Sequence, residues 1–159
     1  MITLGLIETW RNNSNGYHLC VPPYDESRQG MKRFGDIEFH LSTFAENYEN
    51  MKRVCTLIQH HYPARKIILT VSPVGLGRTY SGNDIVVANV ESKSLLRAVA
   101  GQICREFPAV QYWPSYELCT REDIYKPDGR HVRQDVIDMI VETFIKAYAQ
   151  GAAPAPAAT

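Results

Sequence analysis

Asp128 and His131 are the two residues of this chain whose types and spacing could do chemistry together. They lie in the run Asp128-Gly129-Arg130-His131, just before the last segment with a helical pattern. A carboxylate at this spacing can accept the Nδ1 proton of the imidazole, whose Nε2 then takes a proton from a hydroxyl nucleophile. The pair therefore predicts two members of a Ser-His-Asp triad. Both residue types are also common in loops, so the spacing by itself leaves open a purely structural role.

The serine of such a triad is harder to find. Ser72 follows a predicted buried strand, where nucleophiles often lie, but Pro73 comes next and lacks the backbone N–H that often binds the oxyanion. Ser81 lies in the run Ser81-Gly82-Asn83-Asp84, which has the composition of a turn. The glycines of this region also lack the Lys-Ser/Thr ending of a phosphate-binding loop. The sequence therefore predicts no clear nucleophile for the pair, and neither a cofactor nor a metal.

The composition indicates one ordinary globular domain. Of the 159 residues, 45% are hydrophobic and 21% are charged, and 17 basic residues balance 17 acidic ones. A net charge of zero gives no basic surface for nucleic acid. Met1 is not followed by a signal peptide, and no apolar run is long enough to cross a bilayer. We therefore expect neither a nucleic-acid partner nor a membrane partner.

The cysteines favour a reducing environment. Cys20, Cys55, Cys104 and Cys119 lie far apart in the chain and form no CxxC pair, so their spacing does not fit a zinc site. Cys55 and Cys104 fall in apolar helical stripes, which indicates buried, reduced thiols. Reduced thiols are typical of cytoplasmic proteins, and we predict a cytoplasmic location.

The apolar patterns predict strands that alternate with helices. We expect strands at residues 2–7, 37–41, 66–71 and 110–113, and helices at 44–62, 91–107 and 134–149. Thr43 and Glu46 have the spacing of a capping box at the first helix. The predicted inward stripes are Leu96, Val99, Ala100 and Ile103 in the second helix, and Ile137, Ile140, Val141, Phe144 and Tyr148 in the third. Residues 11–35 read as a long polar loop, and residues 150–159 as a disordered Ala/Pro tail.

This order of elements predicts an α/β fold with three layers, α/β/α, and a mainly parallel sheet over residues 1–149. Ligands of such sheets bind beyond the carboxyl ends of the strands. Three loops leave these ends, after Leu6, after Val71 and after Trp113, so we expect the candidate residues to converge at one edge. A buried parallel strand normally has neighbours on both sides, yet the first predicted strand begins at the start of the chain. We therefore expect that the chain lacks an N-terminal part of its domain.

Five segments occur in an order that points to a known family. They are residues 3–10 (Thr-Leu-Gly-Leu-Ile-Glu-Thr-Trp), 68–74 (Ile-Leu-Thr-Val-Ser-Pro-Val), 88–97 with Ala88-Asn89 and Ser92-Lys93-Ser94, 112–117 (Tyr-Trp-Pro-Ser-Tyr-Glu) and Asp128–His131. Together they resemble the GSCFA domain family, which is grouped with the SGNH/GDSL esterase-like hydrolases. The resemblance covers roughly residues 2–146. It implies an SGNH-hydrolase or flavodoxin-like fold, with Asp128 and His131 as the acid and base of the family's C-terminal block.

The chain departs from this family in two ways. It has no Gly-Ser-Cys-Phe-Ala motif, whose serine is the presumed nucleophile of the family, and the resemblance implies that the first strand, the nucleophile loop and the following helix are missing. SGNH enzymes commonly place Gly-x-Asn after the strand that here precedes Gly5-Leu6-Ile7, so an asparagine donor is absent. We predict Gly5, Glu8, Trp10, Ser72 and Asn89 as substrate-binding residues. Glu8 and Trp10 fit equally well as a solvated acid and a packed aromatic ring.

These features predict a GSCFA-type, serine-dependent and metal-free acyl hydrolase that acts on a small-molecule or carbohydrate acyl ester. The present chain is then inactive alone, because the nucleophile block is absent. One alternative is a non-catalytic module that binds a ligand or a partner, and another is an acyltransferase of polysaccharide modification. We also expect a homo-oligomer, because a missing strand leaves an apolar sheet edge open.

Overall fold

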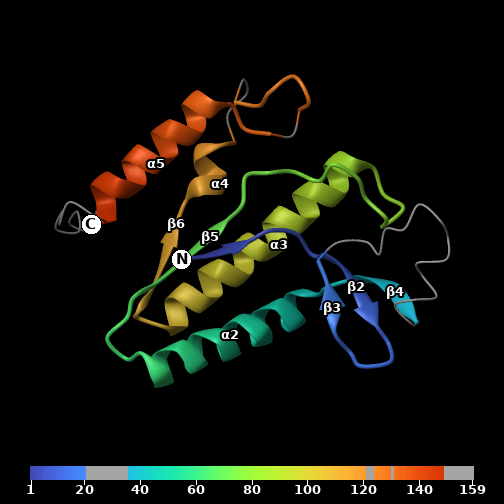
Figure 1. The fold of residues 1–159 in the computed structure, drawn as a ribbon, viewed down its shortest axis with the longest axis horizontal. Helices are drawn as coiled ribbons and strands as arrows, with labels where there is room; N and C mark the ends of the chain where they lie inside the picture. The colour runs from blue at the N-terminus through green and yellow to red at the C-terminus, as the bar shows by residue number, and fades with distance from the viewer. Residues whose placement is uncertain (21–35, 121–123, 130, 149–159) are drawn as a thin grey trace.

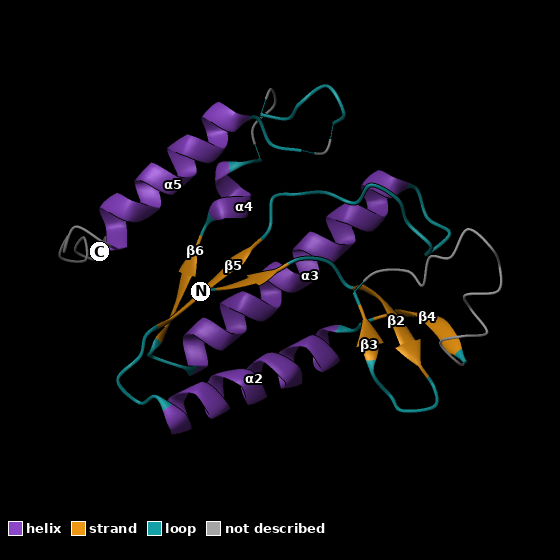
Figure 2. Cartoon of the chain, viewed as in Figure 1, coloured by secondary structure: helices purple, strands orange, loops and turns teal. Residues whose placement is uncertain are grey.

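The computed structural model describes residues 1–20, 36–120, 124–129 and 131–148 (Figure 1). The predicted tail at 150–159 and residues 21–35 of the predicted loop lie outside these residues. The described chain is an α/β protein with two sheets, one parallel and one antiparallel, as Figure 2 shows.

The larger structural unit is built on a parallel sheet of three short strands. They are β1 (Ile2–Leu4), β5 (Ile67–Val71) and β6 (Val110–Trp113), in the order β1-β5-β6. Leu69 and Val71 of the central strand are fully buried. This confirms the predicted parallel sheet, and β5 and β6 lie within one residue of their predicted bounds. The first strand ends at Leu4 rather than at residue 7, because the chain turns away there toward the second sheet.

Two long helices cover one face of this sheet. The helix α2 (Phe44–His61) begins with the predicted capping box, in which Thr43 and Glu46 bond to each other's backbone N–H groups. The helix α3 (Ile85–Glu106) begins six residues before its predicted start. Asp84 caps its first turn, where the Asp84 carboxylate accepts a hydrogen bond from the Val86 N–H at 2.8 Å. The shared core contains Met51, Cys55, Ile67, Leu69, Val99, Ala100, Ile103 and Val110. The predicted inward stripe of α3 is buried and therefore confirmed.

The last helix, α5 (Gln134–Tyr148), lies over the opposite face, where Thr3 and Thr70 face it across a cavity. It contacts the sheet through the Trp113 ring, whose centroid is 5.3 Å from that of Phe144. The prediction that this stripe of the helix is buried is wrong, since no residue of α5 is buried. Val141, for example, is 49% exposed. The stripe is apolar as predicted, but it borders a cavity instead of a filled core.

The small second sheet was not predicted. It consists of β2 (Glu8–Asn12), β3 (His18–Leu19) and β4 (Ile37–Leu41), paired antiparallel in the order β3-β2-β4. Only β4 had been expected, and residues 11–12 and 18–19 of the predicted loop are strand. The local signal for this hairpin is Asn15-Gly16, where Gly16 takes φ +72°, a conformation that favours glycine.

All four cysteines lie in the described part of the chain and are free thiols. Cys55 and Cys119 are buried, Cys104 is partly buried and Cys20 is exposed. Burial raises the pKa of the Cys55 thiol above its usual value. Among these residues, no three His, Cys, Asp or Glu side chains come together in a way that could hold a metal ion. None of the described helices is both long enough and apolar enough to cross a membrane.

The β1 strand forms an edge of the parallel sheet, with β5 as its one neighbour among the described strands. The N–H of Ser72 donates to the Leu4 carbonyl at 2.8 Å, so Leu4 faces β5. Alternate residues of a strand bond to opposite sides, and the backbone N–H and C=O of Thr3 therefore point outward. An open edge of this kind is a template for pairing with another chain.

We expect the 159-residue chain to self-associate through this edge, with dimers or larger species dominating at high concentration. Thr3→Pro removes the outward N–H and should lower the association. Thr56→Pro, in the exposed middle of α2, shows how a folding defect by itself changes the measured mass. Multi-angle light scattering over a concentration series measures the mass. A clean monomer at the highest concentration would contradict the expectation.

Candidate functional site

The two candidate catalytic residues lie in a tight hairpin. Lys126-Pro127-Asp128-Gly129 forms its turn, in which the Gly129 N–H donates to the Lys126 carbonyl at 2.9 Å and Gly129 has φ +65°. Proline at the second turn position and glycine at the fourth are typical of such a turn. The Lys126 N–H donates to the His131 carbonyl at 2.7 Å, which closes the hairpin. This local geometry brings Asp128 and His131 together on one side of the turn.

The Asp128 carboxylate holds His131 through two hydrogen bonds. The His131 backbone N–H donates to Oδ1 at 2.9 Å, and the imidazole Nδ1 lies 2.7 Å from Oδ2. An ionised carboxylate only accepts, so the proton of this contact is on Nδ1, and Nε2 is left as the basic nitrogen of the neutral ring. Both side chains are about half exposed, at 48% for Asp128 and 52% for His131. The predicted contact is therefore present, and the catalytic role of the pair stays a prediction.

Packing below the turn fixes where the pair lies. Cys119, Ile124 and Val132 form a small buried cluster against the start of α5. The hydroxyl of Tyr125 donates to the carbonyl of Pro73 at 3.4 Å, which ties the hairpin to the loop that leaves β5. The pair is thereby held near the carboxyl end of the central strand, where ligands of parallel sheets bind.

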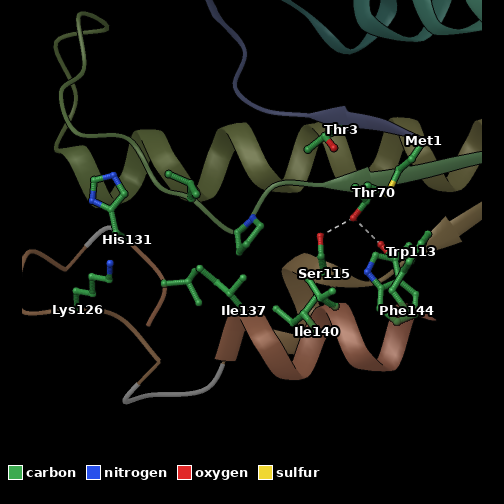
Figure 3. A pocket seen from close by; sticks show the side chains of 14 residues that line it. Met1, Thr3, Thr70, Trp113, Ser115, Lys126, His131, Ile137, Ile140 and Phe144 are labelled. Carbon is green, nitrogen blue, oxygen red and sulfur yellow. Dashed lines mark hydrogen bonds between the residues drawn. The ribbon is translucent and has the colours of Figure 1, made fainter. Parts of the chain in front are cut away.

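His131 borders two cavities. One has a volume of about 400 Å³ and lies between α5 and the sheet, with mostly apolar walls (Figure 3). The other has a volume of about 470 Å³ and lies between the hairpin, the loop after β5 and the start of α3. Asp128 and Asn89 line this second cavity together with backbone of Gly75 and Gly77. The imidazole thus stands between an apolar cavity and a more polar one.

The two buried hydroxyls that line the apolar cavity are engaged with each other. Thr70 and Ser115 are buried, and their oxygen atoms lie 2.5 Å apart. Thr70 Oγ1 also lies 2.7 Å from the Trp113 carbonyl, and Ser115 Oγ donates to the Val71 carbonyl at 2.9 Å. These contacts use both hydroxyl hydrogens and tie α4 (Ser115–Leu118) to β5. Within the described part of the chain, no serine or threonine hydroxyl hydrogen-bonds to His131.

Ser72 lies at the carboxyl end of β5 but lines neither cavity of His131. Its Oγ accepts a hydrogen bond from the Val74 N–H at 3.2 Å, which is the pattern of a serine turn. Its backbone N–H extends the pairing of β5 with β1. These contacts describe a turn residue, and a role in substrate binding stays a prediction.

Asn89 is the one candidate binding residue that lines a cavity together with Asp128 and His131. It projects from α3 into the second cavity, and its Oδ1 accepts a hydrogen bond from the Leu76 N–H at 3.1 Å. A side chain at Gly75 would contact this amide, with an added Cβ only 3.4 Å from Oδ1. The sequence-based choice of Asn89 therefore selects a residue of the site region, although its visible contact holds the loop.

Glu8 and Trp10 brace a different region. The Glu8 carboxylate accepts hydrogen bonds from the Thr79 hydroxyl at 2.5 Å and from the Tyr80 N–H at 3.2 Å. The Trp10 ring packs edge-on against Tyr80 and Phe39, with centroids 4.9 and 5.5 Å away. Neither side chain lines a cavity that His131 borders. Both residues fasten the loop after β5 to the small sheet.

Gly5 and Ile7 are held by two buried residues, Lys93 and Ser92, which the sequence analysis named only as part of a family segment. Lys93 has no exposed surface, and its Nζ donates to the Gly5 carbonyl at 2.8 Å. The preceding residue, Ser92, is equally buried and accepts the Ile7 N–H at 2.9 Å. The signal was present: these residues precede Leu96 by three and four positions, on the inward face of α3. They fix both ends of the loop that leaves β1.

Comparison with known proteins tests the family. The sequence model of the GSCFA family matches residues 1–144. The chain belongs to the GSCFA family. The resemblance seen in five ordered segments is thereby confirmed. No curated protein and no solved structure matches the chain.

In this GSCFA chain, the family segments also form a packing network. The Glu117 carboxylate accepts hydrogen bonds from Arg97 Nε at 2.5 Å and from the Tyr112 hydroxyl at 2.7 Å. The guanidinium of Arg97 lies over the Tyr112 ring, 4.0 Å from its centroid. Burial, together with this carboxylate, raises the pKa of Tyr112 well above its usual value. Much of the family signature therefore connects α3, β6 and α4 to one another.

The buried amine of Lys93 gives the GSCFA fold a pH-dependent stability. Burial lowers the pKa of Lys93 from 10.5 to about 8, so the unfolded chain binds more protons between these values. The free energy of unfolding of the wild type should therefore rise relative to Lys93→Met as the pH passes from below 8 to above 10.5. The expected gain is on the order of 3 kcal/mol. Urea unfolding at several pH values measures it.

Lys66→Met is the matched control, because Lys66 is exposed. Its unfolding free energy should follow the wild type at every pH. Parallel pH profiles for the wild type and Lys93→Met would contradict the prediction.

Proposed function

We propose that this GSCFA protein contributes the acid–base pair of a serine-dependent acyl hydrolase with an SGNH-like, three-layer fold. The observation that carries the proposal is the 2.7 Å contact between His131 Nδ1 and the Asp128 carboxylate, in a chain of this family. The position of the pair beyond the carboxyl end of β5 supports it, because that is where α/β sheets bind ligands.

In the proposed reaction, the nucleophile is a serine outside the described residues, since no described hydroxyl bonds to His131. His131 Nε2 takes the serine proton while the serine oxygen attacks the carbonyl carbon of an acyl ester. The resulting imidazolium gives this proton to the departing alcohol, and an acyl-enzyme remains. Water then attacks the acyl carbon with the same histidine as base, and the serine is regenerated. Asp128 stays ionised throughout and stabilises the imidazolium.

The second candidate function is a module that binds a ligand without turnover. It is supported by the lack of a nucleophile at His131, since no serine or threonine hydroxyl of the described residues hydrogen-bonds to this imidazole. The two functions differ in one respect that can be measured. A hydrolase forms a covalent adduct with a fluorophosphonate probe when its serine is present, and a binding module does not.

The test compares the 159-residue chain with a longer form in which a segment that carries a Gly-Ser-Cys-Phe-Ala motif precedes Met1. We expect the longer protein to hydrolyse p-nitrophenyl acyl esters and to react with the fluorophosphonate. His131→Ala should lower kcat about 10³-fold or more, and Asp128→Asn should lower it about 10²-fold or more. Both substitutions should leave the unfolding midpoint almost unchanged, because an ion pair as exposed as this one contributes little stability.

His61→Ala is the matched control, since it removes an exposed imidazole at the end of α2. It should keep full activity. Full activity of His131→Ala in the longer protein would show that the pair is not catalytic. Failure of both forms to hydrolyse any ester or to react with the probe would favour the binding module instead.

A further inference from the structure

The cavity between α5 and the sheet has the walls of an apolar binding site. Ile137, Ile140, Val141 and Phe144 of α5 form one wall. Trp113 of the sheet packs against Phe144 at one end (Figure 3). The cavity volume of about 400 Å³ is in the range of small-molecule sites. Half-exposed aliphatic side chains around such a space gain free energy when an apolar ligand covers them.

The buried hydroxyls of this cavity have no hydrogen left to donate to a ligand. Thr70 and Ser115 are its buried hydroxyls, and both of their hydrogens are engaged with each other or with backbone carbonyls. No buried side-chain polar atom of the described residues lacks a hydrogen-bond partner. The cavity walls are mostly apolar, and its buried hydroxyls cannot replace the hydration that a polar ligand would lose, so the interior fits a hydrocarbon better.

The polar groups lie together at one end. Lys126 and His131 both border the cavity at the hairpin, on the side away from Trp113 and Phe144, as Figure 3 shows. One is an ammonium and the other is the imidazole of the catalytic pair. A cation at the mouth of an apolar cavity complements the carboxylate or the carbonyl oxygen at the head of an acyl chain.

We propose that this cavity binds the hydrocarbon chain of the acyl group, with the acyl carbonyl beside His131. The second cavity, with Asn89 and the backbone of Gly75, is then left for the alcohol half of the ester. This assignment rests on the proposed hydrolase function, but chain binding itself requires no nucleophile. It names the substrate class as an ester of a medium-length or longer fatty acid.

The test is equilibrium binding of butanoate, octanoate and dodecanoate to the 159-residue chain, measured by isothermal titration calorimetry. Each added methylene should tighten binding about fourfold until the cavity is filled. Lys126→Gln should weaken octanoate binding several-fold and leave binding of methyl octanoate nearly unchanged, because the ester carries no charge. Affinity without any dependence on chain length would overturn the proposal.

Val141→Trp places a bulky ring in the cavity and should weaken octanoate binding tenfold or more. Ile145→Trp is the matched control on the same helix, since Ile145 is exposed and does not line the cavity. Methyl chemical shifts of Ile137 and Ile140 report octanoate binding in the wild type without any substitution. They therefore locate the binding site even if Val141→Trp fails to fold. Unchanged binding to folded Val141→Trp, or methyl shifts elsewhere only, would refute the assignment.

Two further outcomes separate this inference from the proposed function. Octanoate binding with no ester hydrolysis by the longer protein would retain the cavity assignment and reject the hydrolase. Hydrolysis by the longer protein without chain-length preference, and unaffected by Val141→Trp, would reject the cavity assignment alone. If no fatty acid binds and Val141→Trp instead lowers self-association, the cavity is an interface between copies and the proposal fails.

Discussion

The burial of β5 is the constraint on which the rest of the structure depends. This strand pairs with β1 on one side and β6 on the other, and Leu69 and Val71 are fully buried beneath α3. Its carboxyl end is therefore fixed, and so is the start of the loop at Ser72. The hairpin that carries Asp128 and His131 reaches this loop through Tyr125, while α3 holds the loop after β1 through Lys93. The candidate site is assembled from loops that one buried strand positions.

The pair itself has a different physical basis. Its geometry is local, since a Pro-Asp-Gly turn and two hydrogen bonds within four residues set the distance between Asp128 and His131. Its place in the molecule is tertiary, because Val132 and the hairpin base pack against α5. A half-exposed pair contributes little to stability. Folding therefore depends little on this pair, which lies at the edge of two cavities.

Local signals in the sequence predicted the features that local interactions create. The β5 strand, the capping box at Thr43 and the contact between Asp128 and His131 are of this kind. The early start of α3 was missed because Ile85, Val86 and Val87 are β-branched and exposed, and only the cap at Asp84 marks the helix.

Pairing and packing over long distances could not be derived in the same way. The small sheet joins residues 8–12 to residues 37–41, and its one local signal was Asn15-Gly16. The pattern of α5 showed which of its faces is apolar, but not that a cavity lies beneath that face. Residue type alone could not separate Glu8 and Trp10, which brace a loop, from residues that line the site.

The hydrogen bond between His131 Nδ1 and Asp128 is tested most directly by NMR of the imidazole nitrogens in ¹⁵N-labelled protein. The neutral ring should carry its proton on Nδ1 and leave Nε2 unprotonated, and Asp128→Ala should return the ring to the tautomer mixture of a free histidine. A neutral ring protonated on Nε2 in the wild type, or the same spectrum in Asp128→Ala, would contradict the assignment of His131 as a base that Asp128 orients.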